Sequence, residues 1–247
     1  MNISKSVNDQ INLMKPGKFF TYQDIVGFAD HSYAVIKAIS RHAEGLGLMK
    51  VKKGLYYKVV NGHFGPMAPK DSDVIHYFTT NNNKTVGYIT GATLYHRWGL
   101  TTQLPAEIMI ATSTKKREKA EFSGLRITTT PARDKVNKTT IPLLQFLDVL
   151  KNIDRIPDAN IKEVMAKLVQ RLNVYSLKQI NAMEDIAIRA YTARTKALLG
   201  AVLERYLDRL CSKLHQTLNP TSTYKISLAN HLPINLERWY IVSTPTS

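Results

Sequence analysis

The chain has 247 residues, of which 44% are hydrophobic, and 34 Lys and Arg against 19 Asp and Glu give a formal net charge of +15. This is the composition of a globular protein rather than a disordered one, and with no 18-residue apolar run and no apolar N-terminal segment we expect neither a membrane span nor a secretory signal. The single cysteine, Cys211, excludes an internal disulfide, so a cytoplasmic protein is expected.

The first sixty residues carry the most informative pattern. Apolar spacing predicts one helix over residues 6–14, a second over residues 22–29, and a third that starts at Ser32. Thr21 is expected to cap the second helix, and Ser32 or Asp30 the third. The second helix is expected to bury Ile25, Val26 and Phe28. Residues 48–58 then read as two short strands around a Lys-Gly turn. Three helices and a basic hairpin are the order of a winged helix-turn-helix, assigned here to residues 1–62.

The remaining residues, 63–247, are expected to form a larger mixed domain. Residues 60–72 hold two Gly and two Pro and are expected to be a linker. Short strands are predicted at about 85–130 and helices at about 142–218, so the fold class is α+β ending in a helical bundle. The individual predictions are helices over 73–78 and 88–98, strands over 108–112, 121–122 and 125–130, helices over 142–153, 158–172, 176–189 and 192–218, and strands over 224–228 and 239–242.

Sequence motifs for catalysis are not found. The chain has no Gly-rich phosphate loop and no nucleophile elbow, and its seven His and one Cys show no metal-ligand spacing. Asp71 and Asp73 fit a helix start, where acidic residues are favoured. Glu184 and Asp185 fit the solvated face of a helix. We therefore expect no catalytic residues, no metal and no cofactor, and a protein that is not an enzyme.

The excess of positive charge favours a phosphate backbone, although a basic protein without a nucleic-acid role is the alternative. Residues 1–70 carry 10 Lys and Arg against 4 Asp and Glu. In the third helix, Val35, Ala38 and Ile39 form the inward seam. A helix of this kind fits the major groove, where Arg41 can contact guanine and Lys37 a phosphate. The expected DNA-binding residues are Ser32, Tyr33, Lys37, Ser40 and Arg41 on the helix, and Lys50, Lys52 and Lys53 on the hairpin.

Two further basic clusters have two readings each. Residues 115–119 lie between strands and are either an additional DNA contact or a solvated loop. Basic residues between 189 and 209 are either a second surface for nucleic acid or an acidic partner, or ordinary surface charge on amphipathic helices. That set is Arg189, Arg194, Lys196, Arg205 and Arg209.

Three segments give the chain a family resemblance: Gly-Leu-Thr-Thr-Gln-Leu-Pro at 99–105, Arg-Thr-Lys-Ala-Leu-Leu-Gly at 194–200, and Leu-Asn-Pro followed by Tyr224 at 218–224. With the N-terminal pattern, including Ala38-Ile39-Ser40-Arg41 and Gly54-Leu55-Tyr56-Tyr57, the chain resembles the AbiEi-type antitoxins of bacterial type IV toxin–antitoxin, or abortive infection, systems. The resemblance implies a repressor that binds inverted repeats at its own promoter, as a monomer or dimer, and whose larger domain counters a nucleotidyltransferase-like toxin. It places the antitoxin activity on no particular residue.

Two other functions stay open at this point. One is a DNA-processing nuclease targeted by the N-terminal domain, which would require convergent carboxylates that the sequence does not reveal. The other is a protein–protein adaptor whose basic C-terminal helices hold an acidic partner.

Overall fold

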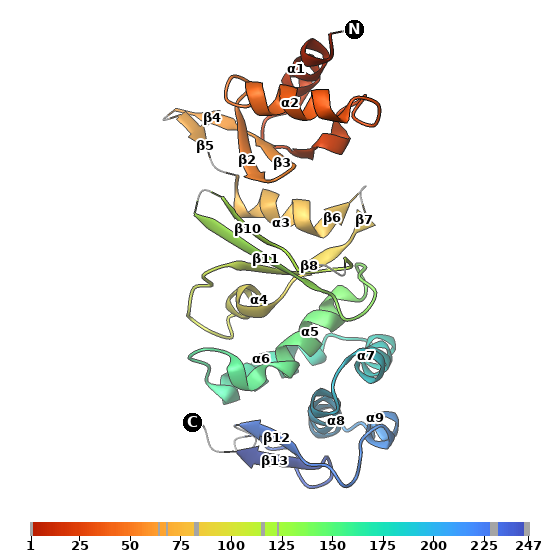
Figure 1. Ribbon diagram of the computed structural model, residues 1–247. Helices are drawn as coiled ribbons and strands as arrows, with labels where there is room; N and C mark the ends of the chain where they lie inside the picture. Colours follow the sequence, from red (N-terminus) through yellow and green to blue (C-terminus); the bar gives the residue numbers. More distant parts are fainter. Residues whose placement is uncertain are drawn as a thin grey trace.

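The computed structural model describes residues 2–63, 65–67, 69–81, 84–114, 117–122, 124–227 and 232–244. Its elements are stacked along an elongated molecule, with the N-terminal helices at one end and the last two strands at the other (Figure 1). The fold is a mixed α+β arrangement with several small sheets, as the sequence predicts.

The N-terminal part combines helices with a three-stranded antiparallel sheet of order β1-β3-β2. Its elements are α1 (Ile3–Leu13), β1 (Phe19–Thr21), the 3-10 helix η1 (Tyr22–Asp24), α2 (Ser32–His42), β2 (Leu48–Lys52) and β3 (Leu55–Lys58). Val7 and Ile11 of α1 pack with Val35 and Ile39 of α2 and with Phe20 in one buried cluster. The apolar seam predicted for the third helix is thus confirmed.

The predicted helix over residues 22–29 is wrong, because only Tyr22–Asp24 forms a helical turn. Two local features replace the helix. The Asp24 carboxylate accepts hydrogen bonds from the Thr21 backbone N–H and hydroxyl, at 2.6 and 2.9 Å. Further along, the Gln10 side-chain amide pairs with both backbone groups of Val26, which is 82% exposed rather than buried. Gly27, with φ of +88°, then turns the chain into α2.

The predicted caps of α2 are also absent. His31 occupies the N-cap position, and no side chain caps the helix there. The segment predicted as a linker contains a small hairpin of β4 (Val60–Gly62) and β5 (Gly65–Met67), in which Gly62 is paired with Gly65.

The central part is a four-stranded sheet of order β10-β11-β9-β8, in which β9 and β11 are parallel and the other pairs are antiparallel. Its strands are β8 (Gly87–Ile89), β9 (Ile108–Thr112), β10 (Lys119–Phe122) and β11 (Leu125–Pro131), and the neighbouring elements are α3 (Asp71–Thr79), β6 (Thr80–Asn81), β7 (Lys84–Thr85) and α4 (Gly91–Arg97). The strands over 108–112 and 125–130 and the helix at 73–78 are confirmed, and α3 has Asp71 and Asp73 in its first turn.

The helix predicted from Tyr88 starts three residues later than expected. Residues 87–89 pair with β9, where a Cβ on Gly87 would lie 2.9 Å from the Ala111 carbonyl oxygen. The close strand contact therefore requires glycine at that position. Gly91, the first residue of α4, has φ of +59° and changes the direction of the chain after the strand.

The N-terminal and central sheets share a hydrophobic core. Phe19, Leu55 and Tyr57 of the first sheet are buried together with Ile110 and Ile127 of the second. The ring of Phe19 lies 5.0 Å from that of Tyr77 on α3. The two regions are therefore packed against each other.

The C-terminal part is helical and ends in a two-stranded parallel sheet. Its elements are α5 (Ile141–Lys151), the 3-10 helix η2 (Ile153–Arg155), α6 (Ile161–Leu172), α7 (Leu177–Ala190), α8 (Ala193–Leu207), α9 (Ser212–Gln216), β12 (Tyr224–Ser227) and β13 (Ile241–Thr244). The single helix predicted over residues 192–218 is divided at Asp208, whose φ of +47° ends α8 in the left-handed region.

Candidate nucleic-acid interface

The exposed face of α2 carries the side chains that the sequence assigns to DNA. Ser32, Tyr33, Lys37, Ser40 and Arg41 are all exposed, and Tyr33 retains 71% of its accessible surface. Because residues three and four positions apart share one face of a helix, most of these side chains form a single stripe. In Figure 1, α2 lies at the end of the molecule that is farthest from the C-terminal strands.

The stripe is positively charged and contains no acidic residue. The Lys37 ammonium lies 4.9 Å from the centre of the Tyr33 ring, which holds the cation over an aromatic face. Within the described part of the chain, no carboxylate is paired with Lys37 or Arg41. Both cations are therefore available to a solvent-borne anion.

One end of the stripe borders a cluster of hydroxyl groups. The Tyr22 and Tyr56 hydroxyls are 3.1 Å apart. Burial, followed by the hydrogen bond to Tyr56, raises the pKa of Tyr22 to about 12, and a hydrogen bond with Ser40 opposes the rise. The Tyr22–Tyr56 contact thus joins η1 to β3.

The hairpin lysines are not equivalent. Lys50 and Lys53 are exposed, and no carboxylate of the described residues is paired with either. Lys52 is instead paired with Glu118, just before β10 of the central sheet. Lys52 therefore differs from Lys50 and Lys53, because it is only partly exposed and its ammonium already has an acidic partner. Lys58 donates to the carbonyl oxygens of Ile11 and Asn12 at the end of α1, at 2.6 and 2.9 Å.

Several basic residues of the C-terminal helices are engaged by other parts of the protein. Arg189 is paired with Asp134 at 2.7 Å and Arg194 with Asp154 at 2.5 Å. The Arg194 guanidinium also donates to the Lys151 and Lys225 carbonyl oxygens. These contacts favour a structural role over a second binding surface. Of the other cluster, Lys115 and Lys116 lie outside the described residues.

Glu184 is buried and does not lie on a solvated helix face as expected. Its carboxylate accepts a hydrogen bond from Arg209 Nε at 2.6 Å, and only 5% of the side chain is exposed. Cys211 Sγ lies 3.8 Å from the same carboxylate oxygen. Burial, with the Glu184 charge next in importance, raises the pKa of the Cys211 thiol to about 12. The turn at Asp208 brings Arg209 and Cys211 to this acid.

The sequence does not predict the buried carboxylate of Asp148 in the centre of the molecule. Asp148 accepts hydrogen bonds from the hydroxyls of Tyr88, Thr90 and Tyr191, at 3.0, 2.8 and 2.8 Å. Burial and then the Asp148 charge raise the pKa of both tyrosines. The arrangement joins β8, α5 and the end of α7. In the sequence, the one indication of this buried carboxylate is that Asp148 is the single acidic residue in the mostly apolar segment 143–150.

No group of three or more His, Cys, Asp or Glu side chains in the described part of the chain is placed to hold a metal ion. None of its helices combines the length and apolar character needed to cross a membrane.

The chain belongs to the DUF6088 family, a family of unknown function, whose match covers residues 6–180. No curated protein matches the chain. Among solved structures, it is similar to the RV2827C protein from Mycobacterium tuberculosis, seen by crystallography, with a TM-score of 0.53 over 97% of this chain and 90% of that chain. The identity of 11% makes this a likeness of fold alone.

The segments that carry the antitoxin resemblance have structural roles. Gly99, with φ of +65°, ends the α4 region, and its carbonyl oxygen accepts a hydrogen bond from Lys167. A Cβ on Gly200 would lie 2.1 Å from the buried Trp239 ring, so that helix position requires glycine. The Tyr224 hydroxyl accepts a hydrogen bond from the Asn219 N–H at 3.2 Å. These residues shape the fold.

Proposed function

We propose that the N-terminal region, residues 3–58, is a winged helix-turn-helix that binds duplex DNA through α2. The connectivity supports the proposal. A helix, a strand, a short helical turn and a second helix are followed by a hairpin, and the first strand pairs with the last. This is the connectivity of winged helices, with η1 in the place of the middle helix.

The single observation that carries the proposal is the unpaired cationic stripe on α2. A helix with its side chains is about 10–12 Å across, and the major groove is about 12 Å wide, so α2 can enter it. Arg41 would contact a guanine edge, while Lys37 and Tyr33 would contact phosphate or base. Lys50 and Lys53 would add phosphate contacts from the hairpin. We therefore propose a non-enzymatic DNA-binding regulator.

The test uses the full chain and duplex DNA from directly upstream of its own reading frame. Replacing Tyr33, Lys37 and Arg41 together with Ala should weaken binding at fixed salt by about a hundredfold or more, since each lost base contact costs about 1–3 kcal/mol. The control removes two positive charges elsewhere, by Lys178→Ala and Lys213→Ala on exposed positions of α7 and α9. Equal losses in both variants would show that only net charge matters and would refute the assignment of α2.

We further propose that the protein represses its own promoter and acts as the antitoxin of a type IV pair, against a nucleotidyltransferase-like toxin. The resemblance in residues 99–105, 194–200 and 218–224 supports this part. On an inverted repeat, two α2 helices would lie about 34 Å apart. A promoter without such a repeat would contradict this arrangement.

Co-expression with an adjacent nucleotidyltransferase-like reading frame tests the antitoxin role separately. The chain should restore growth of cells that express the toxin. The triple α2 variant should restore growth equally, because the proposed antitoxin activity lies in residues 63–247. No restoration by the unaltered chain would overturn the antitoxin proposal and leave DNA binding untouched.

A further inference from the structure

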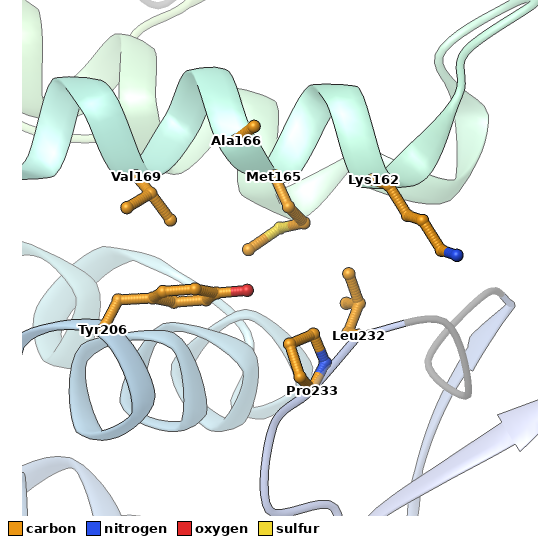
Figure 2. A pocket seen from close by; sticks show the side chains of 7 residues that line it. All are labelled: Lys162, Met165, Ala166, Val169, Tyr206, Leu232 and Pro233. Atoms are coloured by element: carbon orange, nitrogen blue, oxygen red, sulfur yellow. The ribbon is translucent and has the colours of Figure 1, made fainter.

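A cavity of about 680 Å³ lies between the C-terminal helices, far along the chain from α2. One wall is α6, which contributes Lys162, Met165, Ala166 and Val169 at spacings of three and four residues. Tyr206 at the end of α8 and the segment of Leu232 and Pro233 form the other wall (Figure 2).

The lining divides into an apolar body and a charged end. Met165 and Val169 point into the space from α6, and Leu232 and the Tyr206 hydroxyl point into it from the opposite wall (Figure 2). Lys162 is at one end of the row and Val169 at the other. Lys162 is exposed and is the one charged residue among the described residues of the lining.

The charge at this end is not neutralised from within. No carboxylate of the described residues forms an ion pair with Lys162. The neighbouring Glu163 is turned toward Asn160, whose side-chain amide donates to it at 3.4 Å. The cavity therefore offers an ammonium group at one end of a mostly apolar lining, and its described residues include no acidic group.

We propose that this cavity binds a small anionic amphiphile, a carboxylate with an aliphatic body of the medium-chain fatty-acid type. Its volume falls in the range of about 300–1,000 Å³ that is typical of small-molecule sites. The carboxylate would accept a charge-assisted hydrogen bond from Lys162, while the chain packs between Met165 and Leu232. Tyr206 would cover the apolar body with its ring. This inference does not depend on DNA binding.

The test measures displacement of a fluorescent anionic amphiphile, 8-anilinonaphthalene-1-sulfonate, from the full chain without DNA. Decanoate should displace it saturably at one site, at concentrations below micelle formation. Decylammonium, with the same chain and the opposite charge, should bind at least about tenfold more weakly, since the ionic hydrogen bond is replaced by repulsion. Equal competition by the two amphiphiles would overturn the proposed role of the charge.

Two variants locate the site. Ala166→Trp fills the cavity from an exposed position and should abolish decanoate binding, and Val169→Phe blocks the other end as a second test. Lys162→Met should weaken decanoate binding at least about tenfold, whereas Lys178→Met, an equal charge change on α7, should leave it unchanged. Thermal melting confirms that each variant is folded. Retained binding in both blocked variants, or no saturable binding by the unaltered chain, would refute the site.

Discussion

Several cations at the two ends of the molecule are arranged in opposite ways. Residues 1–70 and residues 151–247 each carry six more basic than acidic residues. On α2, Lys37 and Arg41 face solvent without a carboxylate partner among the described residues. In the C-terminal helices, Arg194 and Arg209 are held by partly or fully buried acids. Equal net charge thus accompanies a candidate binding surface at one end and, at the other, arginines that brace the interior together with exposed lysines such as Lys178 and Lys213.

The largest effect on stability is expected from Arg209→Met in the C-terminal part of the protein. Removing the guanidinium leaves the buried Glu184 carboxylate without its ionic partner, which should lower the free energy of unfolding by about 3 kcal/mol. Urea unfolding of the full chain measures the loss. Adding Glu184→Gln should recover most of it, because the buried charge is then gone. A cost below about 0.5 kcal/mol, the scale of an exposed position, would contradict the comparison.

Arg41→Ala should have the opposite profile. We expect about 2 kcal/mol of lost DNA binding, roughly thirtyfold, and a change in unfolding free energy within about 0.5 kcal/mol. Arg189→Ala is the matched control, since Arg189 is 59% exposed and already engaged by Asp134. Titration of labelled promoter DNA distinguishes the two. If Arg189→Ala reduced affinity as much as Arg41→Ala, the two ends would not differ in function.

The hairpin offers a finer comparison between neighbours. Lys53→Ala should reduce the slope of log affinity against log salt by about one unit, because one phosphate contact is lost. Lys52→Ala should change the slope less, since its ammonium is engaged by Glu118. Affinities at several salt concentrations measure both slopes. Equal changes would mean that Lys52 leaves Glu118 when DNA binds.

The smallest effect concerns Tyr22, beneath α2. Its pKa of about 12 lies above the ordinary value of 10, so the fold favours the neutral phenol. The corresponding stability is fully present below pH 10 and is lost as pH rises from 10 to 12. Tyr22→Phe should cost about 1 kcal/mol or less at pH 7 and should lose less stability across that alkaline interval. An identical alkaline loss in both proteins would exclude Tyr22 as its source.

The sequence predicted α2 and its two faces well, because an amphipathic helix of eleven residues carries its burial pattern in its own spacing. The predicted helix over residues 22–29 is wrong for a non-local reason, because the Gln10 side-chain amide forms hydrogen bonds with both backbone groups of Val26. The prediction of a helix from Tyr88 is wrong at residues 88 and 89 for a similar reason, because pairing with β9 holds residues 87–89 as a strand. Local propensity cannot anticipate such tertiary partners.

The candidate site was predictable in part for the same reason. Exposure of Tyr33, Lys37 and Arg41 follows from helix periodicity, whereas the pairing of Lys52 depends on a residue 66 positions away. The Asp148 cluster joins residues from three separate elements and left only a lone acid in an apolar run as a signal. Side-chain partners that are distant in sequence decide which charges are free.

The shared core between the first two sheets has a practical consequence for dissecting the protein. Cutting the chain after residue 62 would leave Phe19, Leu55 and Tyr57 without the apolar surface of Ile110 and Ile127 that covers them. A fragment with such an uncovered face is prone to self-association. If an N-terminal fragment precipitated or bound DNA poorly, the cause would be its exposed hydrophobic core rather than the loss of DNA-contacting residues. Single substitutions in the full chain are therefore the better way to test DNA binding.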